Sequence, residues 1–144
     1  MSLFAALSTG ASGMAAQRAR AEVLVENLAN AETTRTPEGG PYRRKDVVFE
    51  SSTVSSPFAS IFSSQMEEAG GVAVSDIVTD TSAPERRYMP GHPDADKDGY
   101  VAFPRINPAE DMVDLMGAAR NYEANVAAIS AVKDMIQRSI DLMH

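Results

Sequence analysis

The C-terminal stretch Pro108–Met143, PAEDMVDLMGAARNYEANVAAISAVKDMIQRSIDLM, decides the fold. It has no proline after its first residue, and apolar residues recur along it at alternating three- and four-residue spacing. This heptad pattern is typical of a long helix that packs against other helices. Asn107 is a suitable N-cap, Pro108 fits the first helical position, and Glu110 completes a capping-box pattern. We therefore predict one helix over residues 108–143. Its seam positions are Met112, Leu115, Ala119, Tyr122, Val126, Ile129, Lys133, Ile136, Ile140 and Met143.

The N-terminal end carries a second seam of the same kind, which predicts a helix from about residue 2 to about residue 31. Gly10 and Gly13, together with several alanines, would give this helix a slim surface that another helix can approach closely. The alternative is a loosely wound surface helix that frays at its start, because glycine lowers helix propensity. The seam positions are Phe4, Leu7, Ala11, Met14, Arg18, Ala21, Val25 and Leu28.

The middle of the chain differs from both ends, because all eight prolines lie between Pro37 and Pro108. Short apolar runs at 47–49, 72–78 and 100–103, and a further one around Tyr88, predict three or four strands. Residues 51–64 are rich in serine and are expected to form a flexible segment. The predicted class is α+β. Residues 1–31 and 108–144 would form a discontinuous, coiled-coil-like pair of helices, and residues 32–107 a small β-rich inserted domain.

Composition excludes several kinds of partner. The net charge is −7, and no segment is net basic, which argues against nucleic acid. Arg43, Arg44 and Lys45 form the one tight basic cluster, and a solvated loop or strand edge is the expected setting.

There is no cysteine, so disulfides and thiolate metal sites are excluded. No stretch approaches the ~18 apolar residues of a membrane-spanning helix, so no direct membrane insertion is expected. The first residues also lack the pattern of a cleaved secretory signal.

Candidate chemistry is sparse. Residues 94–99, DADKDG, match the front half of an EF-hand calcium loop, but the twelfth position would be Arg105, where that loop needs a bidentate glutamate. An acidic hairpin turn that does not bind calcium is the expected structure. His92 and the terminal His144 cannot build a histidine-rich zinc site, and no GxSxG pattern is present. We therefore predict no catalytic residue, no metal and no cofactor.

Four separated motifs resemble those of the bacterial flagellar rod and hook proteins. Residues 7–17, LSTGASGMAAQ, followed by 27–31, NLANA, resemble the N-terminal signature of that family. Residues 120–126, RNYEANV, are similar to its C-terminal signature. The segments GGPYRR at 39–44 and HPDAD…DGYV at 92–101 resemble the insert of one of its rod members.

This resemblance implies a non-enzymatic subunit whose terminal helices form the inner layer of a hollow axial tube. Its partners would be copies of itself and other rod proteins in the periplasmic part of the basal body, where the rod passes torque from motor to hook. Export unfolded through the flagellar type III apparatus, without cleavage, is also implied. The residues expected at the assembly interface combine signature and seam positions: Leu7, Met14, Asn27, Leu28, Asn30, Leu115, Tyr122, Glu123, Asn125, Val126, Ile129 and Ile136.

Three other interpretations compete. One is a different axial subunit of the same family, and another is a calcium-dependent binding module built on residues 94–99. The third is a small hydrolase acting on the cell wall that a rod must cross. The hydrolase is disfavoured because no acid/base pair stands out in the sequence.

Overall fold

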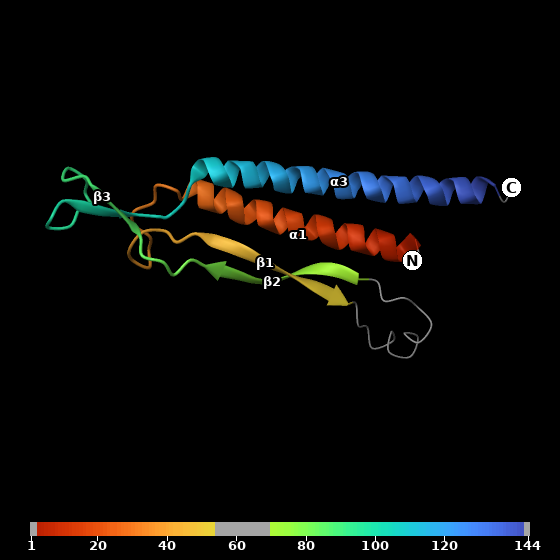
Figure 1. The fold of residues 1–144 in the computed structure, drawn as a ribbon, viewed down its shortest axis with the longest axis horizontal. Helices are drawn as coiled ribbons and strands as arrows, with labels where there is room; N and C mark the ends of the chain where they lie inside the picture. The colour runs from red at the N-terminus through yellow and green to blue at the C-terminus, as the bar shows by residue number, and fades with distance from the viewer. Residues whose placement is uncertain (1–2, 54–69, 143–144) are drawn as a thin grey trace.

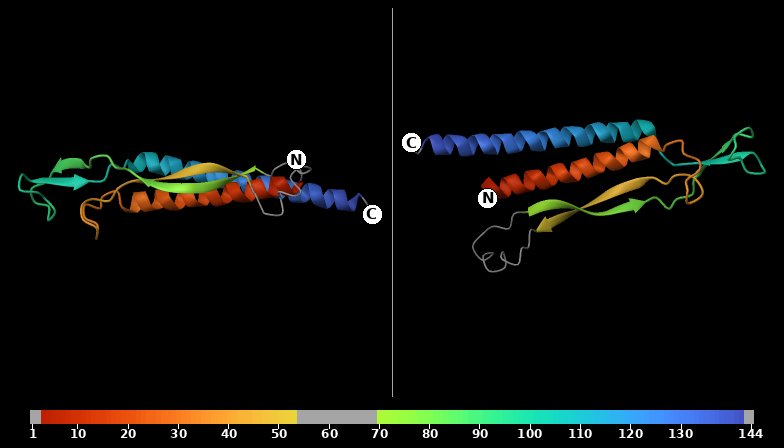
Figure 2. Two further views of the ribbon diagram at one scale, coloured as in Figure 1. Left: turned by 90° about the horizontal axis from the view of Figure 1, so that it is seen from below. Right: turned by 180° about the vertical axis from the view of Figure 1, so that it is seen from behind.

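The computed structural model describes residues 3–53 and 70–142, and two long helices dominate it (Figure 1). Helix α1 spans Leu3–Ala29 and helix α3 spans Pro108–Asp141. The two helices run antiparallel and in contact, and the C-terminal end of α3 extends beyond the start of α1 (Figures 1 and 2). The predicted α+β class, with a helical pair made from both ends of the chain, is confirmed.

A β-hairpin covers a second side of α1. Strands β1 (Lys45–Thr53) and β2 (Gly70–Thr79) pair antiparallel along α1, on the side away from α3 (Figure 2). Ser12 of α1 accepts a hydrogen bond from the N–H of Val72 at 3.1 Å, which attaches the start of β2 to the helix. Helix α1 is therefore the middle layer of the molecule, in contact with α3 on one side and with the hairpin on the other.

The remaining two strands form an arm beyond the helix pair. Strands β3 (Glu85–Tyr88) and β4 (Tyr100–Phe103) pair antiparallel and project past the start of α3 (Figure 1). Gly99 closes the turn between them with a φ of 81°, and a side chain there would meet the Tyr88 ring at 2.9 Å. The described residues contain four strands, in agreement with the expected three or four, and each predicted segment lies within one of them.

One predicted boundary was wrong. The serine-rich segment 51–64 was expected to be flexible throughout, but β1 continues to Thr53 because Ser51 and Ser52 pair with Val72 and Gly71. Residues 54–64 lie outside the described residues. Serine is a weak strand former, so the ladder to β2 rather than local preference extends the strand.

The N-cap predicted for the C-terminal helix is confirmed, whereas the contacts at the end of α1 were not predicted. Asn107 is the N-cap of α3, and its Oδ1 accepts from the N–H of Ala109 at 3.2 Å, with Pro108 at the first helical position. At the end of α1, Asn30 donates from its side chain to the carbonyl of Glu26 at 2.9 Å and accepts from the Thr33 hydroxyl at 3.1 Å. These bonds satisfy groups that the end of a helix leaves open, and the chain turns away there.

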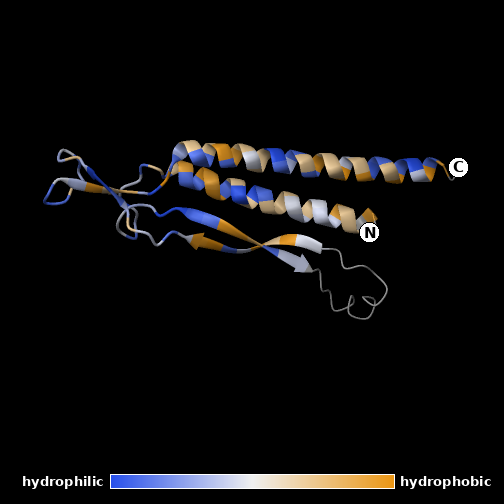
Figure 3. Ribbon diagram, in the orientation of Figure 1, coloured by the Kyte–Doolittle hydropathy of each residue, from blue (hydrophilic) through white to orange (hydrophobic). Residues whose placement is uncertain are grey.

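Few apolar side chains are buried among the residues that the structure describes. The buried ones there are Ala5, Ala16, Val23, Leu24, Tyr42, Val101, Phe103, Pro104 and Ala118. Most of the other apolar residues of α3 remain open to solvent, and Figure 3 shows hydrophobic segments continuing along the whole helix. A core this small relative to the apolar content of the chain indicates surfaces that other molecules cover.

Candidate assembly surface and the polar junction behind it

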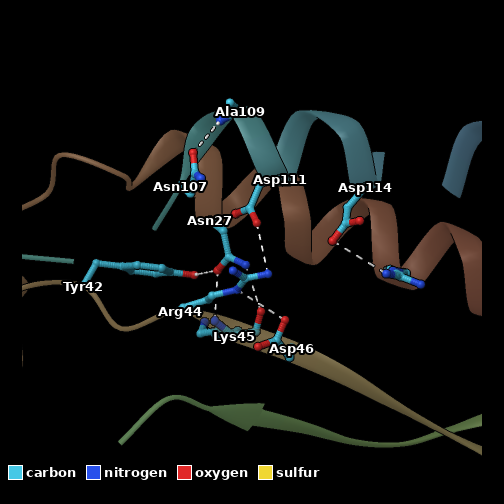
Figure 4. Close-up of polar contacts among 10 residues, drawn as sticks. Asn27, Tyr42, Arg44, Lys45, Asp46, Asn107, Ala109, Asp111 and Asp114 are labelled. Atoms are coloured by element: carbon cyan, nitrogen blue, oxygen red, sulfur yellow. Dashed lines mark hydrogen bonds and ion pairs between the residues drawn. The ribbon is translucent and has the colours of Figure 1, made fainter. Parts of the chain in front are cut away.

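A buried asparagine holds the hairpin against the helix pair. Asn27, near the end of α1, has no exposed surface. Its Oδ1 accepts from the Tyr42 hydroxyl at 3.0 Å and from the N–H of Lys45 at 3.0 Å, while its Nδ2 donates to the carbonyl of Lys45 at 2.8 Å (Figure 4). The Asn27 side chain thus bonds both backbone groups of Lys45, the first residue of β1, as a neighbouring strand would. These bonds fix where the hairpin starts relative to α1.

The tyrosine of this junction is held in its neutral form. Burial, reinforced by the nearby carboxylates of Glu26 and Asp111, raises the pKa of Tyr42 to about 12. Its hydroxyl therefore remains a donor to Asn27 at any physiological pH. Glu26 also pairs with the ammonium group of Lys45, so the end of α1 and the start of β1 are joined by both backbone and side-chain contacts.

An ion pair extends the junction to α3. Asp111, in the first turn of α3, is completely buried, and its Oδ1 lies 3.1 Å from Nη2 of Arg44, just before β1 (Figure 4). Nε of Arg44 also lies 3.4 Å from Asp46. One turn further along α3, Asp114 lies 3.8 Å from Arg20 of α1. Charged groups from three elements therefore meet at one end of the helix pair.

The helix pair itself closes over two glycines. A methyl group added at Gly10 would lie 2.9 Å from Cγ1 of Ile129, and one at Gly13 would lie 3.0 Å from Nδ2 of Asn125. These distances are shorter than ordinary van der Waals contact, so only glycine allows this approach without rearrangement. The predicted slim surface of α1 is confirmed at these two positions.

The outward side of α3 carries many exposed apolar residues. Met112, Val113 and Met116 each expose between 54% and 62% of their surface. Further large apolar residues continue along the helix: Tyr122, Val126, Met135, Ile140 and Leu142. We call these eight residues the outer face of α3. Burying apolar area contributes roughly 25 cal/mol per Å², so such a face favours association with another surface.

The structure distributes the twelve predicted assembly residues unevenly. Asn27 is fully buried, and its hydrogen-bonding groups are used inside the chain. Asn125 and Ile129 contact α1 at the glycine positions. Three of the twelve are exposed: Tyr122, Glu123 and Val126. The others are partly covered: Leu7, Met14, Leu28, Asn30, Leu115 and Ile136. Their roles between subunits remain a prediction.

Sequence reasoning missed the charged part of the junction. The basic cluster 43–45 was assigned to a solvated loop or strand edge, which was wrong for Arg44, because its side chain is only 20% exposed and reaches two aspartates. The available signal was helical phase: Asp111 precedes Leu115 by four residues and Ala118 by seven, which places all three on one face. An acidic residue on the inward face requires a buried cation nearby.

The predicted seam on α1 does not coincide with the residues of α1 that are buried. Arg18, which interrupts it, pairs with Glu22 of the same helix at 2.9 Å, and both side chains are exposed. Val25 is exposed as well, whereas Val23 and Leu24 are buried against other elements. The buried surface of α1 is displaced from the predicted seam because α1 contacts α3 on one side and the hairpin on another.

The aspartate turn in the arm is held by internal contacts. Oδ1 of Asp96 accepts from the N–H groups of Asp98 and Tyr100, both at 2.9 Å, and its Oδ2 pairs with Arg86. Asp94 accepts from the Thr34 hydroxyl at 2.8 Å. Over residues 3–53 and 70–142, no group of three or more histidine or acidic side chains is arranged to hold a metal ion. The carboxylate of Asp96 therefore holds the turn of the arm, and that of Asp94 joins the turn to the segment that follows α1.

Within the same described residues, no helix combines the length and the apolar character needed to cross a membrane.

Comparison with known proteins identifies the family. The family model described as "Flagella basal body rod protein" matches residues 7–35, and the one described as "Flagellar basal body rod FlgEFG protein C-terminal" matches residues 97–142. These are the two terminal regions that form most of the helix pair. The chain belongs to the flagellar basal-body rod protein family.

Curated relatives match over nearly the whole chain. The flagellar basal-body rod protein FlgC of Bacillus subtilis is 43% identical over 150 residues, with 99% of each chain covered. FlgC of Borreliella burgdorferi is 38% identical, again with 99% of each covered. FlgC of Salmonella typhimurium is 36% identical, with 99% of this chain and 98% of the relative covered. The family expectation from the sequence motifs is confirmed, and the chain is a structural component of the flagellar basal-body rod.

Proposed function

We propose that this rod subunit assembles through the outer face of α3 and the exposed seam of α1, against copies of itself and other rod proteins. The observation that carries the proposal is the outer face of α3, whose large apolar residues recur along the helix and are exposed in the single chain. A helix that is apolar on more than one side requires more than one packing partner. Here α1 supplies one partner, and neighbouring subunits would supply the rest.

The proposed mechanical role follows from the same arrangement. A rod that transmits torque must resist relative rotation of its subunits, and long helices in extensive contact provide this resistance better than flexible loops. The Asn27 junction and the Arg44 ion pair would then keep the hairpin and arm in a constant orientation relative to the helices. Membership of the family further supports a periplasmic location in the rod and export through the flagellar type III apparatus.

The outer face can be tested separately from the fold. Val126 is exposed in the single chain, so Val126→Asp should leave the free energy of unfolding of the purified protein within about 0.5 kcal/mol of wild type. In the assembled rod the same carboxylate would be buried without a partner, so rod growth should fail. The measurements are urea unfolding, motility halos, and electron microscopy of isolated basal bodies.

Asn121→Asp is the matched control, because it introduces the same charge at an exposed polar position of α3 that is not on the outer face. It should swim better than Val126→Asp. Normal rods and full motility in cells carrying Val126→Asp would show that the outer face is not an assembly surface. Detection of the variant in the culture medium would separate failed assembly from failed export.

A further inference from the structure

The carboxylate of Asp111 is buried without adequate compensation. It has no exposed surface, and Arg44 is its one ion-pair partner among the described residues. Among these residues, no donor reaches either of its oxygens with hydrogen-bond geometry, and Nε of Arg44 is likewise without a hydrogen bond. A buried carboxylate is ordinarily stabilised by several donors, so its removal from water is poorly offset here.

The groups facing Asp111 are mostly acidic. The charged groups that act on it are Arg44 and Asp46 from the hairpin side and Glu110 and Asp114 from α3 itself, and the Tyr42 hydroxyl also interacts with it. Around them, α1 contributes Arg20, which pairs with Asp114, and Glu26, which pairs with Lys45. Arg44 is shared with Asp46, so its attraction for Asp111 is divided. Burial raises the pKa of Asp111, Arg44 opposes this effect, and the three neighbouring carboxylates reinforce it.

We propose that Asp111 is the proton-binding site of a latch between α3 and the start of β1, and that the latch tightens when Asp111 takes up a proton. Protonation removes a buried charge, provides an O–H donor, and relieves the repulsion from Asp46 and Asp114. Arg44 does not become unpaired, because Asp46 remains 3.4 Å from its Nε. The junction that orients α3 relative to the hairpin would therefore become firmer in mild acid.

The direction of the pH dependence follows from linkage. A carboxyl group whose pKa is higher in the folded chain than in the unfolded chain binds its proton more tightly when folded. Its contribution to stability is fully present below the unfolded value of about 3.9 and is lost as the pH rises through the folded value. Carboxylates with lowered pKa, such as Asp96, lose their contribution in acid, so the effect of Asp111 must be isolated by comparing variants.

The test is a double-mutant cycle on the full chain, with urea unfolding measured at pH 7.5, 6 and 5. Asp111→Asn should unfold no more readily than wild type at pH 7.5. It should also lack the stabilisation on acidification that the Asp111 carboxyl gives wild type. Arg44→Met should be the least stable at pH 7.5, because it leaves Asp111 without its cation, and should gain most from acid. The double variant should recover most of that loss.

Two further measurements keep the result interpretable. Asp134→Asn, at an exposed position of the same helix, should retain the pH dependence of wild type. The carbon chemical shift of the Asp111 carboxyl, followed by NMR, should titrate with a midpoint above 3.9. A midpoint at or below that value, or an Asp111→Asn variant that is clearly less stable than wild type at pH 7.5, would overturn the proposal and identify the pair as an ordinary stabilising salt bridge.

Discussion

At the scale of single residues, Asn27 shows how one side chain fixes the relation between two elements. An asparagine side chain offers two donors and a carbonyl oxygen, and here one donor and the oxygen serve the start of β1 and Tyr42. Because the site is completely buried, water cannot replace any of these bonds. Asn27 was predicted from a family signature to act between subunits. Its contacts within the chain add a role inside the subunit, and the role between subunits stays a prediction.

We expect Asn27→Leu to destabilise the isolated chain by roughly 3 kcal/mol, because it leaves the Tyr42 hydroxyl and both backbone groups of Lys45 buried and unsatisfied. The measurement is urea unfolding of purified protein. Asn121→Leu, at an exposed position of α3, is the control and should change stability little. A small effect of Asn27→Leu would mean that the hairpin is held mainly by other contacts.

At the scale of elements, the sequence predicted the helices and strands well and the phase of helix packing poorly. The predicted seam of α3 and its inward face share Leu115, Ile129 and Ile136, whereas Tyr122, which the seam also included, is exposed. They differ in the second column of residues. The apolar pattern predicted positions 112, 119 and 126 for it. In the structure, the covered positions are instead 111, 118, 125 and 132. The inward column contains Asp111 and Asn125, so it was less apolar than the outward one.

Hydrophobicity alone could not resolve this ambiguity. A search for the most apolar stripe of a helix selects the face with the most apolar area. In a subunit of an assembly, that face can contact other subunits and need not be the one that packs within the chain. The polar contacts that decide the phase join residues far apart in sequence, such as Arg44 and Asp111. No periodicity within one helix encodes such a pairing. The caps were easier to predict because Asn107 and Pro108 act on their immediate neighbours.

Replacing a glycine by alanine should change stability in opposite directions in the two helices. Gly117 of α3 has open space around it, so Gly117→Ala should stabilise the isolated chain by about 1 kcal/mol through helix propensity. Gly10→Ala gains the same propensity but forces a methyl group against Ile129. Overpacking costs typically about 1–3 kcal/mol, so the net effect should be destabilising. Thermal and urea unfolding of both variants provide the measurement, and equal signs would contradict the observed approach of the helices.

At the scale of the whole molecule, the arrangement of contacts raises the question of which parts fold together. The sequence predicted a helical module and one inserted domain covering residues 32–107. In the structure the hairpin lies along α1 and is bonded to it at both ends, through Ser12 at one and Asn27 at the other. The arm has its own small cluster of side chains, in which the ring of Phe103 contacts the ring of His92 and the guanidinium of Arg87. We therefore propose that the hairpin belongs with the helices and that the arm is a separate unit.

Native-state hydrogen exchange in low urea should distinguish these divisions, because amides of one cooperative unit share the same opening free energy and urea dependence. Amides of β1 and β2 should exchange together with those of residues 16–29 of α1, whereas those of β3 and β4 should open at lower free energy with a smaller urea slope. Val72→Pro removes the backbone N–H that donates to the Ser12 hydroxyl. This variant should lower the protection of amides in α1 as well as in the hairpin. The protection of amides in the arm should not change. If β1 and β2 instead exchanged together with the arm and independently of α1, residues 32–107 would be one inserted domain, as the composition of the chain first indicated.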